Sequence, residues 1–78
     1  MRQIENHMNI KDLIEGERRI ISHFTDERIG GKLMCMGLKP GNTVEVVRKT
    51  NRNRTFYLKS NSHRLAIREN EAAIIELK

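Results

Sequence analysis

The sequence of 78 residues lacks several features that would assign it to a familiar class of small protein. Its single cysteine, Cys35, cannot form an internal disulfide, and a lone thiol in a short chain is typical of a reducing compartment. Tryptophan is absent, and the aromatic residues are two phenylalanines and one tyrosine. This scarcity argues against recognition of proline-rich peptides, because the grooves that bind them are lined by aromatic rings.

Long hydrophobic runs are also missing. No apolar stretch approaches the ~18 residues of a membrane span. Residues 1–7 are polar and lack the apolar centre of a signal peptide, so we expect a soluble, cytoplasmic protein. The length fits one domain whose hydrophobic residues, 37% of the chain, fill one small core. We expect a loose N-terminal extension over residues 1–9 and a single domain over 10–78.

Positive charge is concentrated in one part of the chain. Residues 46–68 contain seven lysines and arginines and no acidic residue, whereas basic and acidic residues balance over 1–45. Such a block could meet phosphates, an acidic protein surface or anionic lipids. The alternative interpretation is a solvated face that keeps a small protein soluble.

Short alternating segments predict a mainly β structure. A β-prone segment covers 18–24, and apolar and polar residues alternate over 44–48, 55–59, 64–68 and 73–77. Polar turns separate these segments, and residues 69–72 suit one helical turn before the last strand. Five strands at this spacing predict a small SH3-like β-barrel, with a short helix between its first and second strands.

The short helix should begin after Thr25 or Asp26, either of which can cap it. Two consecutive glycines at 30 and 31 disfavour helix, so we expect a firm helix only over 32–36. Gly37 suits the left-handed residue that ends a helix, with Leu38 folding back onto the last turn. Pro40 and Gly41 then occupy the central positions of a type II turn.

The corner formed by the end of this helix and the following turn resembles a segment of a known family. Residues 32–48 read KLMCMGLKPGNTVEVVR, which resembles the central motif of FeoA domains: a helix ending in Leu-x-x-Met/Leu-Gly-Leu, then x-Pro-Gly, then a valine-rich strand. Residues 63–68, HRLAIR, are similar to a later strand of that family, and 10–16 to its opening segment. The sequence departs from the family at 50–54, which lack Gly and Pro, and at Ser62–His63, where a Gly-Tyr pair is common.

The resemblance implies a non-enzymatic, cytoplasmic accessory protein of bacterial ferrous iron uptake. Its implied partner is the cytoplasmic part of FeoB, a membrane transporter with a guanine-nucleotide-binding domain. A similar domain ends the DtxR-type metal-responsive repressors, but this chain leaves no room for a preceding DNA-binding domain. We therefore expect the stand-alone accessory protein.

Residues of the corner have two interpretations. Each has a packing or backbone reason to be present, and Gly37, Pro40 and Gly41 serve the turns. The functional interpretation is an apolar patch presented to a partner, with exposed arginines of the basic block at a loop tip speeding the encounter. The candidate partner-binding residues are Leu33, Met34, Met36, Leu38, Lys39, Pro40, Arg52 and Arg54.

Other functions find little support in the sequence. The candidate metal ligands Cys35, His7, His23 and His63 lack ligand-like spacing, so we expect no metal site and no cofactor. No paired nucleophile and base and no phosphate-binding loop are present, which disfavours an enzyme. The serious alternative is a small basic barrel that binds nucleic acid, although Tyr57 alone makes a poor stacking platform.

Overall fold

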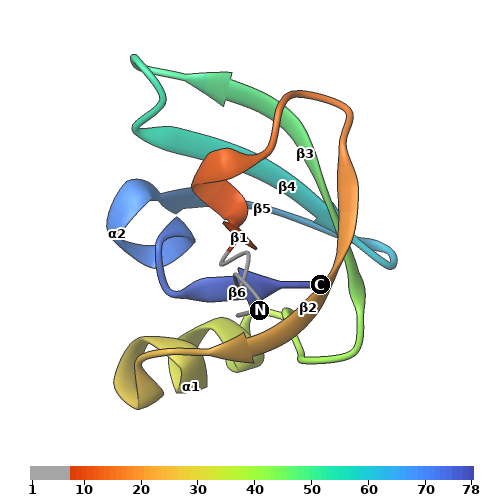
Figure 1. Cartoon of the computed structure of the whole chain (residues 1–78), viewed down its shortest axis with the longest axis vertical. Helices are drawn as coiled ribbons and strands as arrows, with labels where there is room; N and C mark the ends of the chain where they lie inside the picture. The colour runs from red at the N-terminus through yellow and green to blue at the C-terminus, as the bar shows by residue number, and fades with distance from the viewer. Residues whose placement is uncertain (1–7) are drawn as a thin grey trace, which may run out of the picture.

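A computed structural model describes residues 8–78 of the chain. In this described part of the chain strands predominate, and helices and a 3-10 turn connect them (Figure 1). In chain order the elements are β1 (Met8–Asn9), the 3-10 turn η1 (Ile10–Asp12), β2 (Arg18–Phe24), α1 (Glu27–Cys35), β3 (Thr43–Thr50), β4 (Thr55–Ser60), β5 (His63–Arg68), α2 (Glu69–Ala72) and β6 (Ile75–Leu77).

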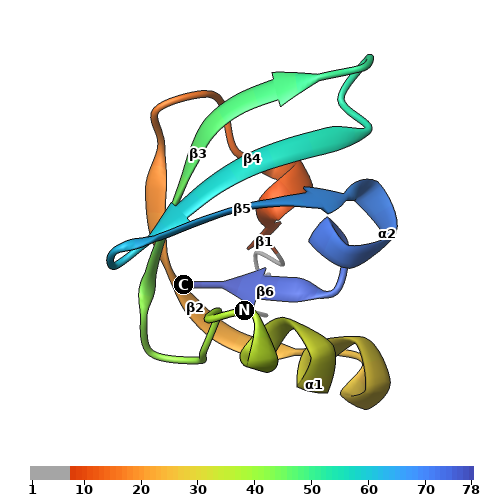
Figure 2. The same cartoon turned by 180° about the vertical axis from the view of Figure 1, so that it is seen from behind.

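Within residues 8–78 the six strands form one antiparallel sheet in the order β1-β6-β2-β3-β4-β5. β2 connects the two halves of the sheet: residues 18–20 pair with β3, and residues 21–24 pair with β6, with a register shift between Ile21 and His23. Because one long strand serves both halves, the sheet curls around the core (Figures 1 and 2). Its end strands, β1 and β5, do not pair within the described residues, so the barrel stays open.

The core lies inside the curled sheet and takes side chains from nearly every element. Alternation puts one face of each strand inward, as the sequence predicts. The described chain contributes thirteen buried hydrophobic residues to one cluster, namely Ile10, Leu13, Ile21, Leu33, Leu38, Val44, Val46, Phe56, Leu58, Ile67, Ala72, Ile75 and Leu77.

Helix α1 is longer than the sequence predicts. Asp26 caps it, with its Oδ1 accepting a hydrogen bond of 2.9 Å from the backbone N–H of Ile29. The helix then runs through both glycines instead of becoming firm only at residue 32. The reason is a tertiary contact: a Cβ at Gly30 would lie 2.8 Å from the Cβ of Phe24, so glycine lets α1 approach β2 closely.

The end of α1 has the predicted geometry. Gly37 has φ +103°, its N–H donates to the carbonyl of Met34 at 3.1 Å, and the N–H of Leu38 donates to the carbonyl of Leu33 at 3.0 Å. These two bonds define a Schellman ending. Residues 39–42 form the predicted turn, with Gly41 at φ +95° and a closing hydrogen bond of 3.1 Å.

A bulge in β3 determines which residues face outward. Val46 lies opposite Leu58, but the next pair is Arg48 with Tyr57, so Val47 is an extra residue. The extra residue turns Arg48 to the outer, solvent-exposed face and brings Lys49 opposite the buried Phe56. Strict alternation with the buried Val44 and Val46 would turn Arg48 inward, and the bulge is what brings it to the outer face.

The loop between β3 and β4 adopts an uncommon conformation. Asn51, Arg52 and Asn53 have φ values of 57°, 58° and 63°, all in the left-handed region. Asparagine tolerates this region better than most residues, whereas arginine does so at a cost. The N–H of Arg54 closes the loop on the carbonyls of Thr50 and Asn51 at 3.2 and 3.1 Å.

At the N-terminus the structure adds a strand to the five that we predicted. The expected extension over 1–9 lies mostly outside the described residues, but Met8–Asn9 form β1 and pair with β6. Asn9 also caps η1: its side chain accepts from Lys11 N–H at 2.8 Å, and its own N–H donates to Asp12 at 3.0 Å. The sequence gives no periodicity over so short a strand.

Candidate functional site

The exposed side of α1 carries an apolar hollow. This side of the helix carries, at helical spacing, Glu27, Gly31 and Met34. Together with Phe24 and Gly30 they line a shallow depression of about 220 Å³. Met34 is 46% exposed, and nothing lies within 4 Å of the position that a Cβ would take at Gly31. The opposite side of α1 packs Leu33 into the core. The helix therefore exposes a methionine side chain and bare backbone at the surface.

Two of the predicted partner-binding residues are not at the surface. Leu33 and Leu38 are both 0% exposed, so the prediction that they contact a partner is wrong. The Schellman ending folds Leu38 back onto the helix and seals both side chains inside. Met36 is half-buried and packs against the core. These residues hold the corner in place from within.

Lys39 and Pro40 are exposed, as the prediction requires. They extend the accessible surface from α1 into the following turn. We use the name helix corner for the half-buried Phe24 together with the exposed residues Gly31, Met34, Lys39 and Pro40.

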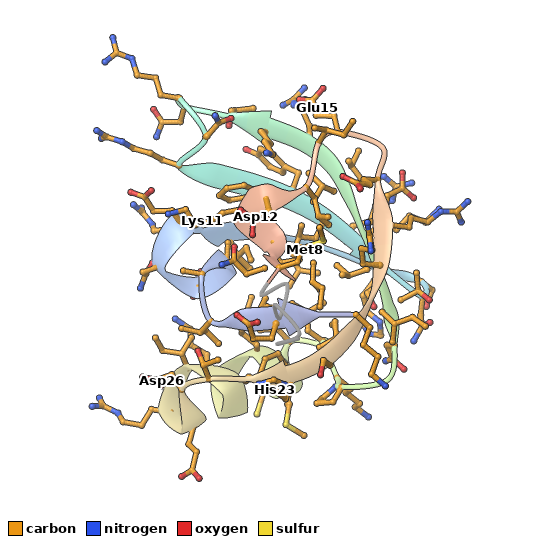
Figure 3. The ribbon with its side chains drawn as sticks, in the orientation of Figure 1. Met8, Lys11, Asp12, Glu15, His23 and Asp26 are labelled. Atoms are coloured by element: carbon orange, nitrogen blue, oxygen red, sulfur yellow. The ribbon has the colours of Figure 1, made fainter. Side chains whose placement is uncertain are left out.

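Arg52 and Arg54 do not lie beside the helix corner. They occupy the β3–β4 loop, which lies at one end of the molecule's long axis, whereas α1 lies at the other end (Figure 1). Figure 3 shows the same separation, with Asp26 near α1 and Glu15 at the opposite end. Both arginines are exposed. The predicted set of partner-binding residues therefore divides into two distant parts.

The candidate metal ligands are not brought together. Among residues 8–78 there is no group of three or more His, Cys, Asp or Glu side chains that could hold an ion. His23 forms a 3.0 Å hydrogen bond through Nδ1 with its neighbour Ser22, and Cys35 is exposed on α1. His63 lies against the turn after α1, and His7 is outside the described residues.

A second surface was not identified from the sequence as a site. The outer face of β3, β4 and β5 holds a groove of about 410 Å³, larger than the hollow on α1, with Tyr57 and Val47 each 39% exposed. The guanidinium carbon of Arg48 lies 5.2 Å from the centre of the Tyr57 ring. Alternation places Tyr57 outward, but the bulge that brings Val47 and Arg48 beside it leaves no signal in the sequence.

The protein family of this chain is shown by a family model that matches the whole described region. A family model described as the FeoA domain matches residues 8–78. The chain belongs to the FeoA family. This is an accessory protein family associated with ferrous iron transport, and it is not known as an enzyme family. No curated protein matches this FeoA-family chain closely enough to add a relative.

Solved structures support the same fold. A crystal structure of an iron uptake regulatory protein, FeoA, is 20% identical with a TM-score of 0.80, covering 95% of this chain and 97% of that one. The FeoA protein from Chlorobium tepidum is 25% identical with a TM-score of 0.80, covering 90% and 68%.

FeoA from Stenotrophomonas maltophilia, a crystal structure with zinc described as a prokaryotic SH3 domain protein, is 18% identical with a TM-score of 0.77, covering 91% and 89%. The SH3-like fold that we predicted is thereby confirmed, with the barrel open. Within residues 8–78 of this FeoA-family chain, no helix has the length and apolar character to cross a membrane.

Proposed function

We propose that this chain is a non-enzymatic, cytoplasmic accessory protein that regulates ferrous iron uptake by binding the cytoplasmic part of a FeoB-type transporter. Family membership supports the link to iron transport. The observation that supports a protein partner is the helix corner, where Met34 stands 46% exposed beside the open backbone of Gly31. Exposed apolar groups around a hollow are typical of interfaces.

The way in which α1 is held suits a docking surface. The Asp26 cap fixes one end of the helix and the Schellman ending fixes the other. A salt bridge of 3.2 Å between Lys32 and Glu71 links α1 to α2, with the Lys32 side chain still 66% exposed. A surface held in this way loses little conformational entropy when a partner binds.

Regulation requires more than binding. A bound protein shifts a transporter between two conformations only if its affinity for the two differs. The helix corner would therefore contact a part of the transporter that changes shape between nucleotide-dependent states. The affinity of the chain for the transporter's cytoplasmic region should accordingly change with the bound guanine nucleotide.

A matched pair of variants tests the site. Met34→Gln should weaken binding to the cytoplasmic region of the transporter about tenfold, because a buried amide without a partner costs roughly 1–3 kcal/mol. Ile14→Gln makes a comparable change at a side chain that is 69% exposed and next to Glu15, at the other end of the molecule (Figure 3). It should bind like the parent. Equal binding by both variants would show that the helix corner does not contact the transporter.

A further inference from the structure

The outer face of β3, β4 and β5 is organised in rows across the strands. Arg48 lies opposite Tyr57, which lies opposite Ala66. The neighbouring row is Glu45, Lys59 and Arg64, and the row on the other side ends at Arg68. We call the residues Val47, Arg48, Tyr57, Arg64 and Ala66 the Tyr57 face.

The groove on this face arises from a small residue between large ones. Ala66 is exposed and stands on β5 between Arg64 and Arg68, so a gap opens next to the Tyr57 ring. Val47, which the bulge turns outward, forms the opposite apolar wall. The resulting volume of about 410 Å³ can accept one large apolar side chain.

Charge surrounds this apolar gap on several sides. Arg48, Lys59, Arg64 and Arg68 are all exposed, and Glu45 is the only acid in the rows described above. Like charges placed so close repel one another, and an acidic ligand would relieve that repulsion. The complementary ligand is therefore acidic and carries an apolar or aromatic side chain.

We infer that the Tyr57 face binds an extended acidic segment of a protein, with an apolar or aromatic side chain of that segment seated beside Tyr57 and Ala66. Carboxylates on either side of this side chain pair with Arg48 and Arg64. β5 is the last strand of the described sheet, so the groove is open on that side to an extended chain. This surface is separate from the helix corner and goes beyond the proposed function.

A single-stranded nucleic acid fits this face less well. Base stacking needs an accessible ring face, and the guanidinium of Arg48 lies over the Tyr57 ring at 5.2 Å. Phe56, the adjacent aromatic residue, is 0% exposed and cannot extend the platform. The apolar wall of Val47 also has no use in tracking a phosphate backbone.

The test is an NMR titration of the ¹⁵N-labelled chain at about 150 mM salt, where long-range attraction is screened. The probe is the acetylated peptide Glu-Asp-Glu-Phe-Glu-Asp-Glu, compared with the same peptide carrying Ser for Phe and with an oligothymidylate. The Phe peptide should shift the amide signals of Val47, Tyr57 and Ala66, and it should bind more tightly than the other two probes.

Variants locate the binding. Arg48→Gln with Arg64→Gln should lower the affinity for the Phe peptide about tenfold. Ala66→Gln should lower it too, by filling the gap without changing charge. Arg52→Gln with Arg54→Gln removes the same charge from the exposed loop and should leave the affinity within about threefold of the parent. Spectra of the free variants check that each keeps the fold.

Several results would overturn the inference. They are the absence of shifts at millimolar peptide, equal affinity for the Ser peptide, or an equal loss in the loop variant and the Arg48/Arg64 variant. Tighter binding of the oligothymidylate at the same residues would assign the face to nucleic acid instead.

Discussion

The imidazole of His63 lies directly against Gly37, on the side where a side chain would begin. A Cβ at residue 37 would be 3.0 Å from both Cδ2 and Cγ of His63. Gly37 ends α1 and His63 begins β5, so the contact joins the two segments that carry most of the resemblance to the FeoA family. The left-handed turn and the close approach therefore both require glycine at this position.

Gly37→Ala should lower the free energy of unfolding by about 1 kcal/mol or somewhat more, because alanine is strained at φ +103° and meets the imidazole. Thermal or denaturant melts measure the loss. In the Gly37→Ala/His63→Ala double variant, the loss of unfolding free energy that comes from the clash with the imidazole should disappear. The loss that comes from backbone strain at residue 37 should remain. A melt of Gly37→Ala that matches the parent would contradict the left-handed ending.

Two adjacent glycines in α1 should respond in opposite directions. Gly30→Ala should destabilise the fold by roughly 1–3 kcal/mol, because the new methyl group would sit 2.8 Å from Phe24. Gly31→Ala has open space and should stabilise α1 by about 0.5–1 kcal/mol. Melts of the two variants side by side check this, and the same sign for both would disprove the close packing of α1 on β2.

These glycines also show where sequence reasoning succeeds and where it fails. The turn at Gly37 and the Pro40–Gly41 turn are local, so residue type alone predicted them. Gly30 packs against Phe24, and this contact depends on how α1 folds back against β2, which residue type alone does not show. Glycine has a low helix propensity, so the sequence argued against helix at Gly30. The close packing of α1 on β2, which requires glycine there, is visible only in the structure.

The same distinction applies to the candidate site. The sequence predicted that Leu38 folds back onto the last turn of the helix, but it did not indicate that this contact leaves both Leu33 and Leu38 fully buried. Met34 is exposed because the other side of α1 packs against the sheet. Arg52 lies far from α1 because the β3–β4 hairpin is long. Val47 shifts the face of β3 through a bulge that the sequence does not mark.

Nucleic acids should bind weakly at physiological salt. The basic block supplies charge, but its exposed aromatic residue is Tyr57 alone, and Arg48 covers that ring. Fluorescence anisotropy with mixed-sequence DNA and RNA at about 150 mM salt should therefore show little or no binding. Tight binding with a steep salt dependence would favour the nucleic-acid function over the accessory one.

Arg52 and Arg54 should influence how fast the partner is found. They are exposed and lie at the end of the molecule opposite α1, so we expect them to act through long-range attraction to an acidic partner surface. Arg52→Gln with Arg54→Gln should slow association at low salt. The difference should shrink near physiological salt, where the Debye length is ~8 Å.

The control for this variant is its stability. Exposed loop charges contribute little to folding, so its melt should match that of the parent. Stopped-flow or surface-based kinetics at two ionic strengths measure the association rate. If the double variant associates as fast as the parent at low salt, the basic block serves solubility and not encounter.

Titration calorimetry measures directly whether this chain binds the cytoplasmic region of a FeoB-type transporter, with that region taken from the same organism. The titration is run with that region free of nucleotide and then loaded with a guanine nucleotide. We expect saturable binding whose affinity differs between the two conditions. If no heat of binding is detected at concentrations of about 100 μM, the binding free energy is weaker than ~5–6 kcal/mol. That result would contradict the proposed complex with the transporter.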